Sequence, residues 1–249
     1  MIEKNEAIIV FNNKNSQYLL MNNLSLDIIG YITEFIECDK EKCYLMMTCT
    51  WISGCNFRFN ERIDFNNISQ SIWFDYFVNI IAHDTVSFPL HITHLTFYNF
   101  FNKNIENKIP TTVTHLMFGS QFDQSIIGCI PSSVINLEFG YLFDQPIEDC
   151  IPSNVIHLKF GSHFNHTINN NIPDSITYLT LGCQFRPSLS GLSKLSVTHL
   201  TLCACHEKWK DIVKISSVTN LHFTGFIDKL KETQIMNGLI RDNLSITFE

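Results

Sequence analysis

Four histidines recur at a fixed interval and are the side chains best suited to chemistry. They are His94, His115, His157 and His199, and the intervening positions of the same column hold Asn136, Tyr178 and Asn220. If the segments that carry them stack at strand spacing, neighbouring imidazoles lie about 5 Å apart. Such a pair could bind a metal ion or sense protons. The alternative, a row of surface side chains with no metal, is the interpretation that we favour.

The cysteines offer a second candidate for chemistry. Cys203-x-Cys205-His206 is half of a zinc site, but no second pair follows at zinc spacing, which favours a buried thiol. Four more match no zinc pattern: Cys38, Cys43, Cys49 and Cys55. Nine cysteines at irregular spacing do not indicate a disulfide framework, so we expect reduced thiols in a cytoplasmic protein.

Composition excludes several classes of function. Lys plus Arg number 17 against 24 for Asp plus Glu, a formal net charge of −7, and no basic block is present; we expect no nucleic-acid partner. No apolar run approaches the roughly 20 residues of a membrane span. The sequence has no nucleophile elbow, zinc-protease, Walker or dinucleotide-binding motif, so we expect no enzyme and no cofactor.

A repeat of 21 residues positions these side chains. It is marked by five prolines, Pro89, Pro110, Pro131, Pro152 and Pro173. The first apolar column is Ile92, Val113, Val134, Val155, Ile176, Val197 and Val218. The second is Leu95, Leu116, Leu137, Leu158, Leu179, Leu200 and Leu221. The third is Phe97, Phe118, Phe139, Phe160, Leu181, Leu202 and Phe223. Such a period indicates a solenoid.

Each unit predicts one short strand followed by an irregular return. Leu116 and Phe118 alternate with His115 and Met117, which is the period of a half-buried strand. Gly119 and its equivalents end the strand where the chain must turn. Stacked coils would share one core beside a parallel sheet. Cys203 and Thr224 replace the glycine and Lys194 and Leu195 replace the proline, so later returns should differ in shape.

Two segments of the repeat together resemble the FNIP repeat. They are Phe143-Asp144-Gln145-Pro146-Ile147 and Val113-Thr114-His115-Leu116-Met117-Phe118-Gly119. That family is leucine-rich-repeat-like and occurs in social amoebae and giant DNA viruses. The resemblance covers about residues 88–225. It implies a solenoid that binds proteins.

The sequence at the two ends of the solenoid indicates capping elements. Helical spacing of apolar residues predicts a helix over Ser69–Ala82 and another over Asp228–Arg241. Leu244–Phe248 alternates as a strand, which we expect to be the last of the sheet. The predicted fold class is therefore α+β, with an N-terminal arm and helical module in 1–60, a cap in 61–87, the solenoid in 88–225 and a C-terminal helix and strand in 226–249.

Residues 24–51 predict two helices and resemble the F-box, with Ser25 in place of the family's proline and a Cys-to-Trp gap one residue shorter. F-boxes precede FNIP repeats in giant viruses. The resemblance implies docking on a Skp-type adaptor of a cullin ubiquitin ligase in the cytoplasm, which would be the host's if the chain is viral. The adaptor-binding positions that it implies are Leu24, Ser25, Asp27, Ile28, Ile32, Ile36, Leu45 and Trp51.

The outward face of the sheet is the expected site for an unidentified target protein. Its residues are His94, His115, Met117, Asn136, Glu138, His157, Lys159 and Tyr178. We expect Glu138 and Lys159, on adjacent strands, to pair. The alternative function is a stand-alone interaction scaffold in which the N-terminal helices only cap the coils.

Overall fold

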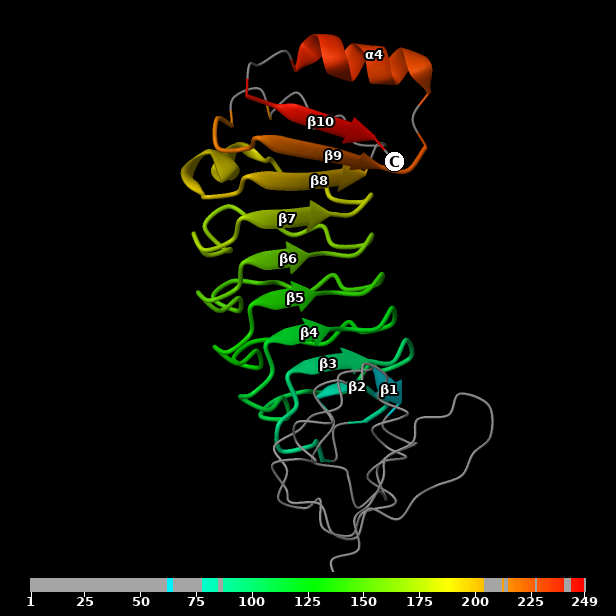
Figure 1. The fold of residues 1–249 in the computed structure, drawn as a ribbon, viewed down its shortest axis with the longest axis vertical. Coiled ribbons are helices and arrows are strands. Elements are labelled where there is room, and N and C mark those ends of the chain that lie inside the picture. The colour runs from blue at the N-terminus through cyan, green and yellow to red at the C-terminus, as the bar shows by residue number, and fades with distance from the viewer. Residues whose placement is uncertain are drawn as a thin grey trace, which may run out of the picture.

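One parallel sheet runs the length of the solenoid in the computed structural model (Figure 1). The structure describes residues 62–64, 78–84, 87–203, 212, 215–226, 228–239 and 243–248. In that part of the chain the sheet has ten strands, in sequence order from β1 to β10. They are β1 (Ile63–Asp64), β2 (Asn79–Ala82), β3 (His94–Phe97), β4 (His115–Met117), β5 (Asn136–Glu138), β6 (His157–Lys159), β7 (Tyr178–Leu181), β8 (His199–Cys203), β9 (Asn220–Thr224) and β10 (Ser245–Phe248).

The predicted repeat register is confirmed residue by residue. Leu95 pairs with Leu116, Leu116 with Leu137, and the pairing continues in the same way to Leu221. The leucines of this column are at most 2% exposed, and the Ile/Val column is completely buried. Each buried side chain of this size stabilises the fold by about 1.5–3 kcal/mol relative to exposure. The coils therefore share one continuous core.

Phenylalanine rings stack along the solenoid in two rows inside that core. In the strand row, Phe118 and Phe139 have centroids 5.4 Å apart and nearly parallel planes. In the second row, which begins each return, Phe122 and Phe143 are 6.2 Å apart. Within one coil the two rows touch, with 4.1 Å between the rings of Phe118 and Phe122. The aromatic richness of the sequence thus serves the core.

The glycine after each central strand is required by close approach of neighbouring coils. A Cβ on Gly140 would lie 2.0 Å from the carbonyl oxygen of Gly119, and one on Gly161 would lie 1.9 Å from that of Gly140. From the sequence, these glycines are expected to supply the backbone freedom that a turn needs. The structure corrects that reason: Gly128 and Gly225 are the glycines with positive φ in the described residues, whereas Gly140 has no room for a side chain.

A ladder of Asn and Asp side chains links the returns. Asn102 Oδ1 accepts the backbone N–H of Asp123 at 3.0 Å, and Asp123 Oδ1 accepts that of Asp144 at 3.0 Å. Asp144 and Asn165 repeat the bond to the next coil, at 2.9 and 2.8 Å. Each bond satisfies a backbone donor that no strand partner reaches. The Asn or Asp after each return phenylalanine is therefore structural, and the ladder ends at Arg186.

The N-terminal part of the sheet corrects one prediction. Residues 79–82, predicted as the end of a helix, form β2, whose Ile80 and Ala82 face the core and are fully buried. Alternate residues 80 and 82 fit a strand as well as a helix, and pairing with β3 settles the choice. The sheet also includes β1, so it begins before residue 88. Residues 65–77 and the F-box-like segment 24–51 lie outside the described residues.

The C-terminal elements agree with the predicted cap. Helix α4 (Lys229–Gly238) lies beyond β10 at the end of the stack (Figure 1), and Ile235 and Leu239 join the core. Strand β10 pairs in parallel with β9 despite the intervening helix. Where the proline is missing, the return contains a short 3₁₀ helix at Ser190–Lys194, which confirms that later returns differ.

Candidate functional site

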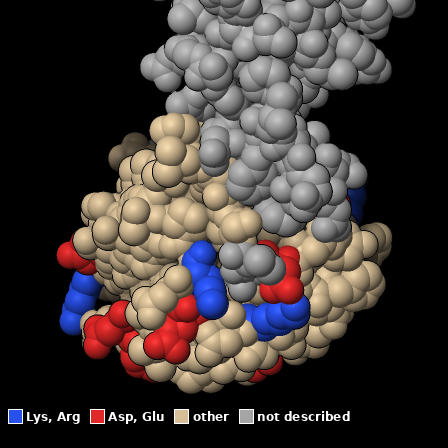
Figure 2. Space-filling model, turned by 90° about the horizontal axis from the view of Figure 1, so that it is seen from below, with Lys and Arg blue, Asp and Glu red and all other residues tan. Residues whose placement is uncertain are grey.

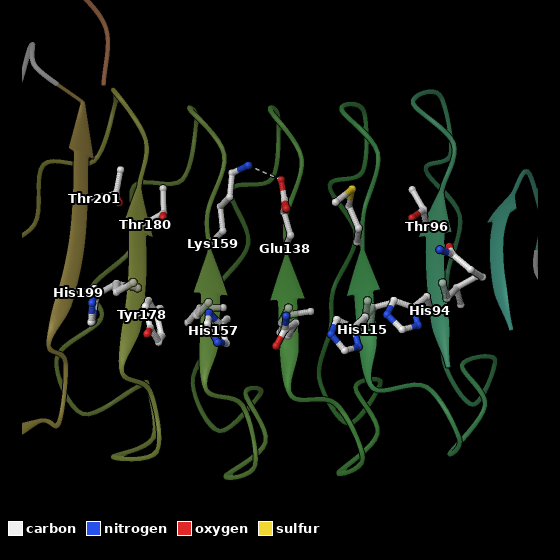
Figure 3. Close-up of a pocket in the computed structure, with 18 of the residues that line it drawn as sticks. His94, Thr96, His115, Glu138, His157, Lys159, Tyr178, Thr180, His199 and Thr201 are labelled. Atoms are coloured by element: carbon white, nitrogen blue, oxygen red, sulfur yellow. Dashed lines mark hydrogen bonds and ion pairs between the residues drawn. The ribbon is translucent and has the colours of Figure 1, made fainter. Parts of the chain in front are cut away.

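A shallow groove of about 440 Å³ follows the outward face of the sheet from β2 to β8 (Figure 3). Two columns of outward side chains line it, because strand residues alternate between the core and solvent. The first column contains His94, His115, Asn136, His157, Tyr178 and His199. The second contains Thr96, Met117, Glu138, Lys159, Thr180 and Thr201. The leucines between the columns also line the groove, but their side chains point into the core.

The first column is a row of stacked rings. His94 and His115 have centroids 4.0 Å apart and planes inclined by 12°. Tyr178 stacks on His157 at 4.1 Å and on His199 at 4.2 Å. Asn136, which pairs with His115 on one side and His157 on the other, separates the two groups of rings. The expected ladder of surface side chains is thus present, at the spacing of the strands.

Threonines fix the orientation of three of these imidazoles. Thr93, Thr114 and Thr198 each precede a histidine, and each Oγ1 lies 2.9 Å from the Nδ1 of that neighbour. These threonines were not predicted as part of the site, although the recurring Thr-His dipeptide signals them. They position the rings from the bend that enters each strand.

Burial lowers the pKa of three imidazoles in this column, and proximity to other histidines adds to the effect at two of them. Burial lowers the pKa of His94 below its ordinary value. The pKa of His115 is lowered first by burial and then by His94 and His157. Burial, and then His199, lowers the pKa of His157. At neutral pH these three imidazoles therefore carry little charge.

Glu138 and Lys159 form the predicted ion pair across β5 and β6. Both side chains are partly exposed, at 32% and 52%, so the pair contributes under about 1 kcal/mol to stability.

Arg62, an exposed residue beside β1, lies at one end of the groove and was not predicted as a site residue. Viewed from the end of the molecule in Figure 2, Lys and Arg adjoin Asp and Glu, with no broad area of one sign on the visible described surface.

All eight predicted target-binding residues line this one groove. Their role in binding a target stays a prediction. The eight predicted adaptor-binding positions between Leu24 and Trp51 lie outside the described residues, as do Cys205 and His206. Cys203 is buried at the end of β8, as expected for a core thiol.

Other features of the described residues add no second site of this kind. Within those ranges no three His, Cys, Asp or Glu side chains converge as metal ligands. Cys129 and Cys150 are buried free thiols in adjacent coils, and burial is the main cause that raises the pKa of both. None of the helices in the described part of the chain is long and apolar enough to cross a membrane.

Comparison with known proteins defines the class. The FNIP Repeat family model matches residues 101–142 and 143–184, each match covering two coils, so the chain contains FNIP repeats there. The solved structure of CroV588, described as a novel circular LRR protein, is similar with 27% identity and a TM-score of 0.51. The similarity covers 70% of this chain and 27% of the CroV588 chain, so this chain spans about a quarter of that protein. No curated protein matches. The molecule is thus a leucine-rich-repeat-like solenoid that carries FNIP repeats.

Proposed function

We propose that this protein is an interaction scaffold that captures a target protein in the groove of the sheet. The observation that carries the proposal is the contrast between the two faces of the same strands. Inward positions repeat the same residue types, whereas the second outward column changes from Met117 to Glu138 to Lys159 in three consecutive strands. Packing imposes no choice at these outward positions, so selection by a partner is free to act on them. Both matched groups, FNIP repeats and a leucine-rich-repeat protein, are repeat proteins, which supports a binding role over catalysis.

A more specific proposal concerns the N-terminal segment. The F-box-like pattern of residues 24–51 supports a role as the substrate-recognition subunit of a cullin-type ubiquitin ligase, acting in the cytoplasm. In this proposal Leu24, Ile28, Ile32, Leu45 and Trp51 contact the Skp-type adaptor. The groove would then present the target to the ligase. The alternative is the scaffold without the adaptor.

The target-binding role is tested by affinity capture from cell extract with quantitative mass spectrometry. A full-length variant with Met117→Ser, Glu138→Gln and Tyr178→Ser should lose the proteins that the unmodified chain enriches. A matched variant on the returns, with Glu106→Gln, Ile127→Ser and Glu148→Gln, changes exposed residues away from the groove and should retain them. Loss of capture in the second variant alone would place the binding face on the returns.

The adaptor role is tested with a purified Skp-type adaptor and the full-length chain. A triple change of Ile28, Ile32 and Leu45 to Lys should abolish binding while the melting temperature of the coils stays the same. If the triple variant also unfolds the coils, those side chains are buried against the solenoid, and the scaffold without an adaptor is the better description.

A further inference from the structure

The Thr-His pairs indicate which ring nitrogen carries the proton. Thr114 Oγ1 donates to the carbonyl oxygen of Thr93 at 3.2 Å, and Thr93 Oγ1 donates to that of Val78 at 3.4 Å. A hydroxyl has a single hydrogen to donate. Having given it to a carbonyl, each hydroxyl can only accept from the adjacent imidazole. This arrangement favours the tautomer of His94 and of His115 that carries the hydrogen on Nδ1.

A neutral imidazole protonated at Nδ1 has a lone pair at Nε2. His199 supports the assignment independently. Thr198 Oγ1 lies beside its Nδ1 and donates to the carbonyl oxygen of Thr177, as in the other two pairs. Its Nε2 lies 2.7 Å from Nδ2 of Asn220, a nitrogen that can only donate. At His199 the acceptor is thus already used. Among the described residues, no side chain or backbone group bonds to Nε2 of His94 or His115.

We propose that the Nε2 atoms of His94 and His115 form an acceptor pair that binds an arginine side chain of the target. The two rings are parallel and 4.0 Å apart, so both lone pairs point in the same direction into the groove. A guanidinium carries five N–H donors on a planar fork and can give one to each acceptor. A bond from a cationic donor is also stronger than one from a neutral donor. This inference rests on the proposed function, since it names the chemistry of the segment that the groove captures.

The proposal also predicts release in acid. Protonation at Nε2 replaces the acceptor with a donor and a positive charge, which repels arginine. The titratable and charged groups that share the groove are His157, His199, Tyr178, Arg62 and the Glu138–Lys159 pair. Of these groups, His157 further lowers the pKa of His115, which burial and His94 already lower. The pair should stay neutral, and able to accept, to a pH below that of an ordinary histidine.

The first experiment measures the tautomers by ¹⁵N NMR of the full-length protein at pH 7.5. His94 and His115 should show protonated Nδ1 and unprotonated Nε2, and Thr114→Val should reduce this preference at His115 alone. A dominant Nε2–H form in the unmodified protein would overturn the proposal.

The second experiment titrates N-acetylarginine amide against tetramethylammonium chloride at equal ionic strength. The arginine derivative should shift the Nε2 signals of both histidines in a saturable way, and the shift should vanish at pH 5. Tetramethylammonium, a cation without N–H donors, should have no effect. Equal shifts with both cations would show simple charge attraction and refute the acceptor pair.

Matched variants isolate the pair. His115→Phe keeps a flat ring stacked beside His94, as Tyr178 does beside His157, but removes one of the two acceptors and should abolish the saturable shift at Nε2 of His94. His199→Phe removes an acceptor that Asn220 already occupies and should leave it unchanged. These measurements use no target protein, so their failure would leave the capture experiment standing, and failed capture would not alter the tautomers.

Discussion

The inner and outer faces of the same ten strands follow opposite rules. On the inner face, Leu116, Leu137 and Leu158 occupy identical positions with the same residue and no exposure beyond 2%. On the outer face, Met117, Glu138 and Lys159 occupy identical positions with an apolar residue, an anion and a cation. The comparison shows that coil stacking restricts one face only. Substitutions on the inner face should therefore alter stability, and those on the outer face should alter binding.

The largest expected effect is at the inner face. Leu137→Asp places a charge without a partner in the shared core, and a destabilisation of more than about 4 kcal/mol is expected. Because coils are stabilised by their neighbours, several should unfold together. Circular dichroism during thermal unfolding measures the loss, with Leu137→Met as a control that should cost less than about 1.5 kcal/mol. An unchanged melt for Leu137→Asp would contradict the solenoid.

The second effect tests the close approach of the coils. In Gly140→Ala the new methyl group would lie 2.0 Å from a backbone oxygen, so coils must shift, at a cost of at least about 1–3 kcal/mol. Gly128→Ala is the matched control, because nothing lies within 4 Å of its Cβ position and its φ of 65° costs about 1 kcal/mol. Chemical denaturation should rank Gly140→Ala as the more damaging. If Gly128→Ala is the more damaging, backbone freedom rather than close approach explains why glycine recurs at Gly140 and its equivalents.

A smaller effect is expected from the histidines of the outer face. In the folded chain the pKa values of His94, His115 and His157 lie below the ordinary 6.5. The unfolded chain therefore takes up these protons first as the pH falls, which favours unfolding. This contribution to stability is complete above about pH 6.5 and is lost as the pH drops through the lowered values. The melting temperature should fall from pH 7.5 to pH 5, and it should fall less in the His94→Phe, His115→Phe variant.

The sequence alone was sufficient to predict the coils because their determinants are local and periodic. The columns through Val113, Leu116 and Phe118 show the period, the alternation and the core in the residue types themselves. The start of the sheet was mispredicted because Ile80 fits both a helical and a strand period, and the β2–β3 pairing decides between them. The function of Gly140 depends on a backbone atom of the preceding coil, which no single repeat reveals. Likewise, the orientation of His115 follows from the hydroxyl of Thr114, which is itself bonded to the carbonyl oxygen of Thr93 in the preceding coil.

The smallest change in stability, and a clear test of the outer face, is exchange of its ion pair. Glu138→Lys with Lys159→Glu keeps both charges on adjacent strands and lets them pair again in reverse. Because an exposed pair contributes under about 1 kcal/mol, the melting temperature should stay nearly constant. A partner that contacts these side chains would instead meet the opposite charge at both positions and bind more weakly. The contrary result is that the exchange leaves capture unaffected while changes to exposed residues of the returns abolish it. That result would show that the varied outer column does not select the target.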